Sequence, residues 1–186
     1  MNQMALSTRS APWNGFRSVL CPIDFSEPSR LALRYAEAIA LRGNAALTVA
    51  YANDPLLVEA AGAALHDRHI AKQSASELRA FIDETITAGS QKRLRLKSEV
   101  STGHPADQIL RAATRRRSDL LVLGTHGLTG AGRLLVGSTT LTILQRTTIP
   151  VLAVPRPEQR PTTDVLPSWP GERIVAALAL DAGRCQ

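Results

Sequence analysis

Short runs of consecutive apolar residues recur along the chain, and longer stretches with helical spacing separate them. A run of about four to eight apolar residues bounded by turn residues is typical of a strand buried on both faces of a sheet. We therefore predict buried strands wherever these runs occur. They are RSVLCPID (17–24), AALTVAYA (45–52), DLLVLG (119–124) and PVLAVP (150–155).

The separating stretches carry apolar residues every three or four positions, the period of a helix with one buried face. In the first of them, Leu31, Tyr35 and Ile39 fall on one face. Ser26 is suited to cap the start of this helix, and Gly43 is suited to follow its end. Residues 55–68 give no clear pattern. The predicted helices cover about 26–43, 70–88, 104–118 and 138–148.

The segment LRLKSEV (94–100) has a different pattern from the other strands. Its even positions are apolar or small, and they alternate with the charged Arg95, Lys97 and Glu99. One buried face and one wet face are typical of a strand at the edge of a sheet. We predict that this strand is an edge strand.

The predicted order is β-α-β-α-β-α-β-α-β, which indicates an α/β fold with a parallel sheet and helices on both of its faces. In such an open sheet the ligand crevice lies at the carboxyl ends of the strands, where the strand order reverses. Asp24 ends the first strand and Gly124 ends the fourth. If those strands are neighbours, the two residues face each other across that crevice.

The stretch GTHGLTGAGRLLVGST (124–139) is the most glycine-rich part of the chain. A glycine loop that leads from a strand into a helix presents backbone N–H groups at the positive end of the helix dipole, where phosphate binds well. The stretch lacks the lysine of a Walker A loop, and it follows the fourth strand rather than the first. Its glycines spell G-x2-G-x9-G-[ST].

Three motifs together resemble the nucleotide-binding branch of the universal stress protein family. They are the G-x2-G-x9-G-[ST] pattern, PIDFSEPS (22–29) after the first strand, and GHPADQIL (103–110) before the third helix. The resemblance covers about 16–154. It implies a Rossmann-like sheet of five strands in the order 3-2-1-4-5, with ATP bound at the crevice together with Mg²⁺.

The resemblance also implies which residues contact ATP. Asp24 would contact the ribose or the adenine side, and the backbone of Ala52 would meet adenine. The phosphates would be held by the loop residues Gly124, Gly127, Gly137, Ser138 and Thr139. Among the remaining loop residues, His126 could touch phosphate or lie in solvent, and Arg133 could steady the triphosphate or stay on the surface. The full set of expected contacts is Pro22, Ile23, Asp24, Ala52, Leu123, Gly124, His126, Gly127, Arg133, Gly137, Ser138 and Thr139. For Asp24 the alternative is a cap on the helix that begins near Ser26.

Binding is better supported than turnover, because no residue is identifiable as a general base and the loop has no lysine for a transferring phosphoryl group. The function expected is therefore an ATP-binding regulator of the stress response with little or no hydrolysis. One alternative is a slow ATPase or nucleotide-transforming enzyme, and a second is a nucleotide-free scaffold. The scattered His66, His69 and His104 complete no metal site.

The fifth predicted strand is apolar, yet the order 3-2-1-4-5 places it at an edge. An unpaired apolar edge invites pairing with another chain, and the resemblance implies the same pairing. We therefore expect a homodimer through Val151, Leu152, Ala153 and Val154. A signalling partner is also expected, but the sequence does not identify it.

Composition and the chain ends complete the prediction. The net charge is +6, but the basic clusters at 91–97 and 115–117 contain no aromatic residues to stack bases, so we expect solvated faces rather than nucleic-acid binding. Two cysteines, no secretory leader and no apolar stretch of membrane-spanning length favour a cytoplasmic protein. We expect four parts along the chain. They are a flexible arm at 1–15, the nucleotide-binding domain at 16–155, a proline-rich linker at 156–172 and a strand-like extension at 173–186.

Overall fold

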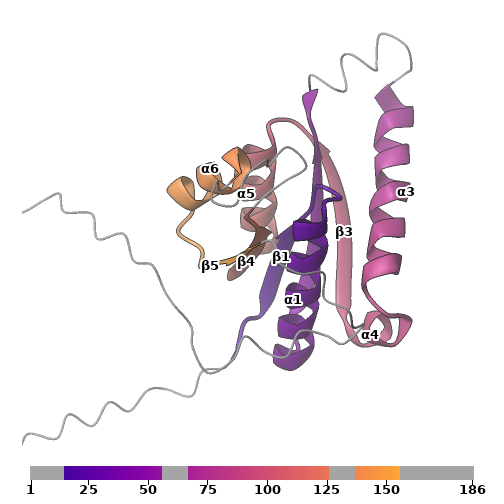
Figure 1. Cartoon of the computed structure of the whole chain (residues 1–186), viewed down its shortest axis with the longest axis vertical. Helices are drawn as coiled ribbons and strands as arrows, with labels where there is room; N and C mark the ends of the chain where they lie inside the picture. The colour runs from indigo at the N-terminus through magenta and orange to yellow at the C-terminus, as the bar shows by residue number, and fades with distance from the viewer. Residues whose placement is uncertain (1–14, 56–66, 126–136, 156–186) are drawn as a thin grey trace, which may run out of the picture.

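A computed structural model describes residues 15–55, 67–125 and 137–155 of the chain. Five parallel strands form one sheet in the order β3-β2-β1-β4-β5 (Figure 1), which confirms the predicted order. Val19 of the central strand lies opposite Leu47 on one side and Leu120 on the other. The strands are β1 (Ser18–Pro22), β2 (Ala46–Asn53), β3 (Arg95–Thr102), β4 (Leu120–Gly124) and β5 (Val151–Val154).

Helices cover both faces of the sheet. The helices are α1 (Glu27–Gly43), α3 (Asp67–Thr85), α4 (Ala88–Arg93), α5 (Pro105–Arg116) and α6 (Ser138–Arg146). Side chains from α1 and α3 pack with alternate residues of the strands, such as Val19 and Val122, in one hydrophobic core. Side chains from α5 and α6 pack with the intervening residues, such as Leu20 and Leu121, in a second core. The continuous apolar runs are explained by this burial on both faces.

The first helix begins as predicted and ends one residue later than predicted. Ser26 is its N-cap, and the Ser26 hydroxyl accepts a hydrogen bond from the Ser29 N–H at 3.3 Å. Gly43 lies inside the helix, and Asn44 takes the left-handed cap conformation with φ of 49°. Asn tolerates this conformation because its short polar side chain can bond locally. Gly43, predicted to follow the end of the helix, is instead its last residue.

The stretch predicted as one helix over 70–88 consists of two. α3 ends at Thr85, and Thr87 caps the short α4 by accepting a hydrogen bond from the Ser90 N–H. Ser90 also lies close to Glu37 of α1, whose side chain is buried. Burial raises the pKa of Glu37, while Ser90 and Arg34 act in the opposite direction. α4 therefore covers a buried carboxyl group that helical spacing did not reveal.

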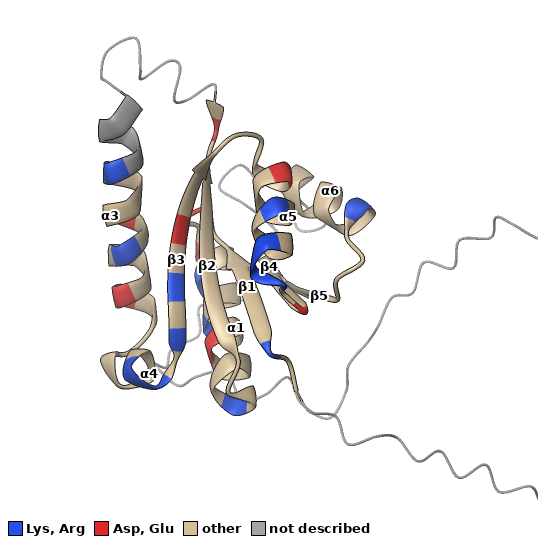
Figure 2. Ribbon diagram, turned by 180° about the vertical axis from the view of Figure 1, so that it is seen from behind, with Lys and Arg blue, Asp and Glu red and all other residues tan. Residues whose placement is uncertain are grey.

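β3 lies at an edge of the sheet as predicted, but its wet face is partly covered. Glu99 accepts hydrogen bonds from Arg115 at 2.9 Å and from Arg116 at 2.7 Å, both on α5. Ser98, predicted to be buried, is exposed. Figure 2 shows basic residues on β3 and α5 on this side of the molecule. The charges at this edge thus tie α5 to the sheet.

Candidate functional site

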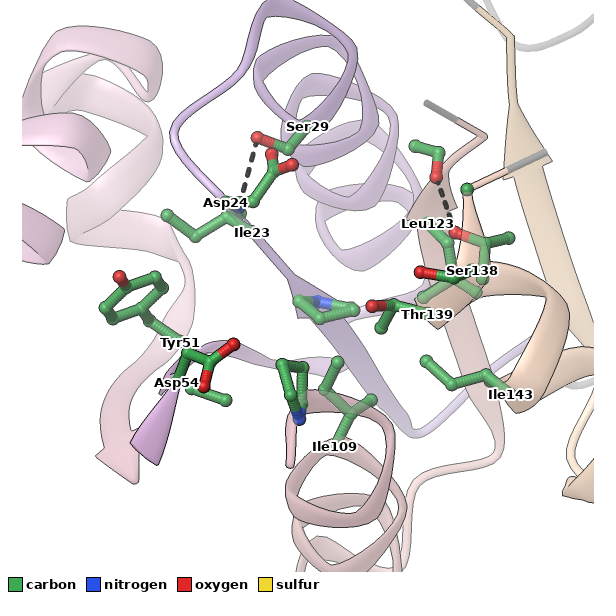
Figure 3. A pocket seen from close by; sticks show the side chains of 16 residues that line it. Ile23, Asp24, Ser29, Tyr51, Asp54, Ile109, Leu123, Ser138, Thr139 and Ile143 are labelled. Carbon is green, nitrogen blue, oxygen red and sulfur yellow. Dashed lines mark hydrogen bonds between the residues drawn. The ribbon is translucent and has the colours of Figure 1, made fainter. Parts of the chain in front are cut away.

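A cavity of about 340 Å³ opens at the carboxyl ends of β1, β2 and β4. Its volume lies within the range of about 300–1,000 Å³ that is usual for small-molecule sites. Figure 3 shows the side chains that line it. These residues are Pro22, Ile23, Asp24, Ser29, Tyr51, Ala52, Asp54, Pro105, Ile109, Leu123, Gly124, Gly137, Ser138, Thr139, Thr140 and Ile143.

One side of the cavity carries Asp24, Tyr51 and Asp54, and we call it the carboxylate wall (Figure 3). Asp24 follows β1, and its Oδ1 accepts hydrogen bonds from the Ser26 N–H at 3.1 Å and the Ser26 hydroxyl at 2.5 Å. The Asp24 N–H approaches the Ser29 hydroxyl at 3.4 Å. These bonds fix the carboxylate at the cavity, so Asp24 supports the start of α1 and also lines the site.

The turn after Asp24 is held by aromatic packing. Phe25 has φ of 64°, a left-handed conformation that is costly for a bulky residue. Its ring lies 4.6 Å from the Tyr51 ring and 5.5 Å from the Phe81 ring, measured between centroids. Arg30 lies 4.3 Å from the centroid of the Phe81 ring. The Tyr51 ring, which lines the cavity, is therefore one end of a packed aromatic cluster.

Tyr51 and Asp54 come from the end of β2. Burial raises the pKa of the Tyr51 phenol, and the negative charges of Glu77, Asp24 and Asp54 raise it further. The phenol therefore stays protonated through neutral pH, and it can donate as well as accept a hydrogen bond. This wall combines a neutral hydroxyl with two carboxylates.

The opposite side of the cavity is the start of α6, and we call it the α6 wall. Its side chains are Ser138 and Thr139 (Figure 3). The first helical bond runs from the Leu141 N–H to the Gly137 carbonyl, so the N–H groups of residues 138–140 precede the regular bonding of the helix. The N-cap residue Gly137 has no side chain with which to cap this end of α6. These N–H groups and the helix dipole make the wall electropositive.

Two hydrogen bonds position the α6 wall against β4. The Thr140 hydroxyl donates to the Gly124 carbonyl at 2.9 Å. The Gly137 N–H donates to the Thr125 carbonyl at 2.7 Å, which brings together the two ends of the segment 126–136. The Gly137 N–H is thus used within the protein. This bond is a structural role for Gly137 that the sequence analysis did not anticipate.

Gly124 is required for packing. A Cβ at Gly124 would lie 3.0 Å from the Pro28 carbonyl carbon and 3.1 Å from the Ser29 nitrogen, both backbone atoms in the first turn of α1. Gly137 has φ of −58°, which any residue adopts. The sequence analysis assigned both glycines to phosphate. The structure gives Gly124 a separate reason to lack a side chain, namely the close approach of β4 to α1.

All of the expected contact residues that the structure describes line this one cavity. His126, Gly127 and Arg133 lie outside the described residues. Sequence reasoning missed several lining residues. Asp54 gave a signal because it follows the carboxyl end of a strand as Asp24 does, and Ser29, Pro105 and Ile109 lie within the two stretches that resemble the family. The lining residues that were not expected are Ser29, Tyr51, Asp54, Pro105, Ile109, Thr140 and Ile143.

Within 15–55, 67–125 and 137–155, no group of three His, Cys, Asp or Glu side chains could hold a metal ion. None of the described helices has the length and apolar character needed to cross a membrane.

Comparison with known proteins agrees with the fold. Universal stress protein MJ0531 of Methanocaldococcus jannaschii is 27% identical over 149 residues, which cover 78% of this chain and 86% of that protein. The structure of universal stress protein UspA from Lactobacillus plantarum matches with a TM-score of 0.59 and 28% identity, covering 75% of this chain and 98% of that one. A universal stress protein in complex with cAMP matches with a TM-score of 0.52 and 24% identity, covering 75% and 97%. Residues 15–155 match the sequence model of the universal stress protein family, and the chain therefore belongs to that family.

Proposed function

We propose that this protein is an ATP-binding regulator of the stress response, which holds the nucleotide in the cavity with little or no hydrolysis. The observation that carries the proposal is the polarity of the cavity. Carboxylates lie on one wall, and helix N–H groups and hydroxyls lie on the other. A nucleotide has the matching polarity, because its ribose and base donate hydrogen bonds and its phosphates accept them.

The phosphates belong at the α6 wall. Backbone N–H groups at a helix start bind anions, and a hydrogen bond to a charged group contributes about 1.5–3 kcal/mol. Two or three such bonds, with the Ser138 and Thr139 hydroxyls beside them, supply much of a micromolar affinity, which corresponds to about 8 kcal/mol. Mg²⁺ is bound mainly by substrate phosphates and water. The two hydroxyls fit that chemistry without a carboxylate cage.

The nucleoside belongs at the carboxylate wall. Asp24 accepts hydrogen bonds from ribose hydroxyls, and apolar residues between the walls, including Ile23 and Leu123, pack against the base. The solved universal stress protein in complex with cAMP supports an adenine nucleotide as the ligand of this fold. ATP is the expected ligand, and the triphosphate extends towards the segment 126–136.

Little hydrolysis is expected because the described lining contains no Lys, Arg or His. Of the lining carboxylates, Asp24 comes closest to what a general base requires, but its Oδ1 already accepts two hydrogen bonds from Ser26. A slow ATPase remains the alternative. A turnover number near the ~1–100 s⁻¹ of kinases would favour that alternative.

The first experiment is calorimetric titration of the purified protein with ATP, together with mass spectrometry of any nucleotide released on denaturation. Gly137→Val keeps a backbone conformation that valine adopts and adds a side chain at the cavity, so we expect ATP affinity to fall about tenfold, or about 1.4 kcal/mol. Circular dichroism checks that the variant folds. Unchanged ATP affinity in the folded variant, or no binding by the wild type, would contradict the assignment.

We also propose a homodimer through the open edge of β5. The Pro150 and Val154 carbonyls accept hydrogen bonds from β4, so by alternation the backbone groups of Val151 and Ala153 point to the open edge. Val154 is buried within the protomer, whereas Ala153 is exposed. Ala153→Pro removes one edge donor and should give monomers in sedimentation experiments, while Ala153→Ser should not. A wild-type monomer at micromolar concentration would contradict this pairing.

A further inference from the structure

The outer face of α6 carries two exposed leucines. Leu141 is 47% exposed and Leu144 is 43% exposed, and within the described residues they are the large apolar side chains on the surface. They lie three positions apart, so they are neighbours on the helix. Thr140 and Ile143, on the other side of α6, are buried against the rest of the domain. We call Leu141 and Leu144 the α6 patch.

The chain leaves the described domain close to this patch. The Val154 carbonyl accepts a hydrogen bond from the Thr125 N–H at 2.9 Å, and the Thr125 carbonyl accepts one from the Gly137 N–H at 2.7 Å. The Gly137 carbonyl accepts one from the Leu141 N–H at 2.9 Å. Three backbone hydrogen bonds in series thus connect the end of β5 to the first leucine of the patch. Val154, the last residue of β5, is therefore linked through Thr125 to the start of α6.

The sequence after Pro155 contains a segment that needs an apolar partner. Residues 174–180, IVAALAL, have no charged or polar side chain. The intervening 156–173 are rich in proline and polar residues. A chain of that length spans roughly 20–25 Å on average as a random coil, and a proline-rich sequence spans more. That reach is ample for a patch that three backbone hydrogen bonds in series connect to the end of β5. The α6 patch and the segment 174–180 are thus two apolar parts of one chain that can pack against each other.

We propose that residues 174–180 dock on the α6 patch of the same chain. The tether favours this intramolecular arrangement, because a short linker holds the segment at a high effective concentration near Leu141 and Leu144. A second copy of the protein is the competing occupant. It has no tether to the patch, and the homodimer proposed above uses the backbone edge of β5 instead. Docking lets the C-terminal segment cover the outer side of the helix whose start forms one wall of the cavity.

The test uses a spin label on Cys185, four residues after Asp181. Cys21 is buried, and its burial raises the pKa of the thiol, so Cys185 is the cysteine that reacts. In the full-length ¹⁵N-labelled protein we expect the amide signals of α6 to broaden, while those of α3 serve as the control and stay sharp. Equal broadening of both helices, or none in α6, would overturn the proposal.

A mixed sample distinguishes the two occupants. Here ¹⁵N protein without a spin label is combined with spin-labelled protein without ¹⁵N, so only contacts between chains cause broadening. We expect α6 to stay sharp in the mixture. Broadening of α6 in the mixture as strong as in the single-chain sample would show that the segment of a second copy occupies the patch, and the intramolecular proposal would be wrong.

Substitutions then locate the contact. The pair Leu141→Ser and Leu144→Ser should abolish the broadening of α6, and Leu178→Asp should do the same from the other side. Gln145→Ser, at an exposed polar position of the same helix, is the matched control and should leave the broadening unchanged. Because Leu178 lies beyond residues 15–155, which match the family, its variant remains informative even if the serine pair weakens the domain. Persistent broadening in the Leu178→Asp variant would overturn the proposal.

Discussion

The carboxylate wall and the α6 wall use different parts of the chain to reach the same cavity. The carboxylate wall is made of the side chains of Asp24, Tyr51 and Asp54. Hydrogen bonds from Ser26 hold Asp24, and packing against Phe25 holds the Tyr51 ring. The α6 wall is made of backbone N–H groups and two short hydroxyl side chains. A wall of side chains is sensitive to single substitutions. A wall of backbone groups depends on where the helix begins, and Gly124 and Gly137 control that position.

The two walls also differ in the charge of the ligand groups that they favour. Hydroxyl and amine donors suit the first, and anions suit the second. A ligand that has both kinds of group therefore has one favourable orientation. Substitutions in one wall at a time test this difference between the walls.

The largest effect is expected from Gly124→Ala, which acts where β4 meets the first turn of α1. The new Cβ would lie 3.0 Å from backbone atoms that cannot rotate away. We expect the free energy of unfolding, measured by urea denaturation, to fall by about 1–3 kcal/mol, as for other overpacked sites.

The matched control is Gly89→Ala in α4, where a Cβ would find its nearest neighbour, the Thr87 hydroxyl oxygen, at 4.0 Å. Alanine is a better helix former than glycine, so this variant should be as stable as the wild type or more so. If Gly124→Ala were equally well tolerated, then the close contact with α1 would not explain the glycine.

The next largest effect is expected from Asp24→Asn on the carboxylate wall. The carboxylate accepts stronger hydrogen bonds than the amide does, and a bond to a charged group contributes about 1.5–3 kcal/mol. We therefore expect a loss of about tenfold or more in affinity, measured by calorimetry, and of similar size for ATP and for adenosine. A loss confined to ATP would assign Asp24 to the phosphates or their metal ion, and the proposed orientation would be reversed.

The smallest effect is expected from Thr139→Val on the α6 wall. The substitution removes one neutral hydroxyl and leaves the backbone N–H groups in place, so a loss of about 0.5–1.5 kcal/mol in ATP affinity is expected. Adenosine affinity should not change. Thr142→Val is the control, because the Thr142 hydroxyl donates to the Ser138 carbonyl of the same helix. An equal effect of both variants on ATP would point to a change in the helix instead of a lost contact.

Much of the fold was predictable from the sequence, because burial on both faces leaves continuous apolar runs. The edge position of β3 was predictable for a related reason, since its alternation departs from those runs. The sequence did not reveal the break between α3 and α4. Ile86 continues the helical spacing, and only the capping hydroxyl of Thr87 marks the new start.

The site was predictable where it follows the ends of strands and less so elsewhere. Asp24 follows the end of a strand and Ser138 begins a helix, and the sequence pattern locates both of these positions. Tyr51 belongs to an apolar run, and nothing in that pattern distinguishes a ring that lines a cavity from one in the core. Ile109 and Ile143 likewise have the spacing of core residues. Their place in the cavity depends on how the helices lie over the sheet, which is a property of the assembled fold.

The bond between the Gly137 N–H and the Thr125 carbonyl also sets how freely the length of the intervening segment can vary. It closes residues 126–136 at their base, so the two anchor points stay fixed whatever lies between them. For a loop closed in this way, doubling the number of residues costs only about 0.6 kcal/mol of chain entropy. Insertions or deletions between the anchors should therefore leave the start of α6 in place, so that any change they cause in ATP affinity reports on residues 126–136 themselves.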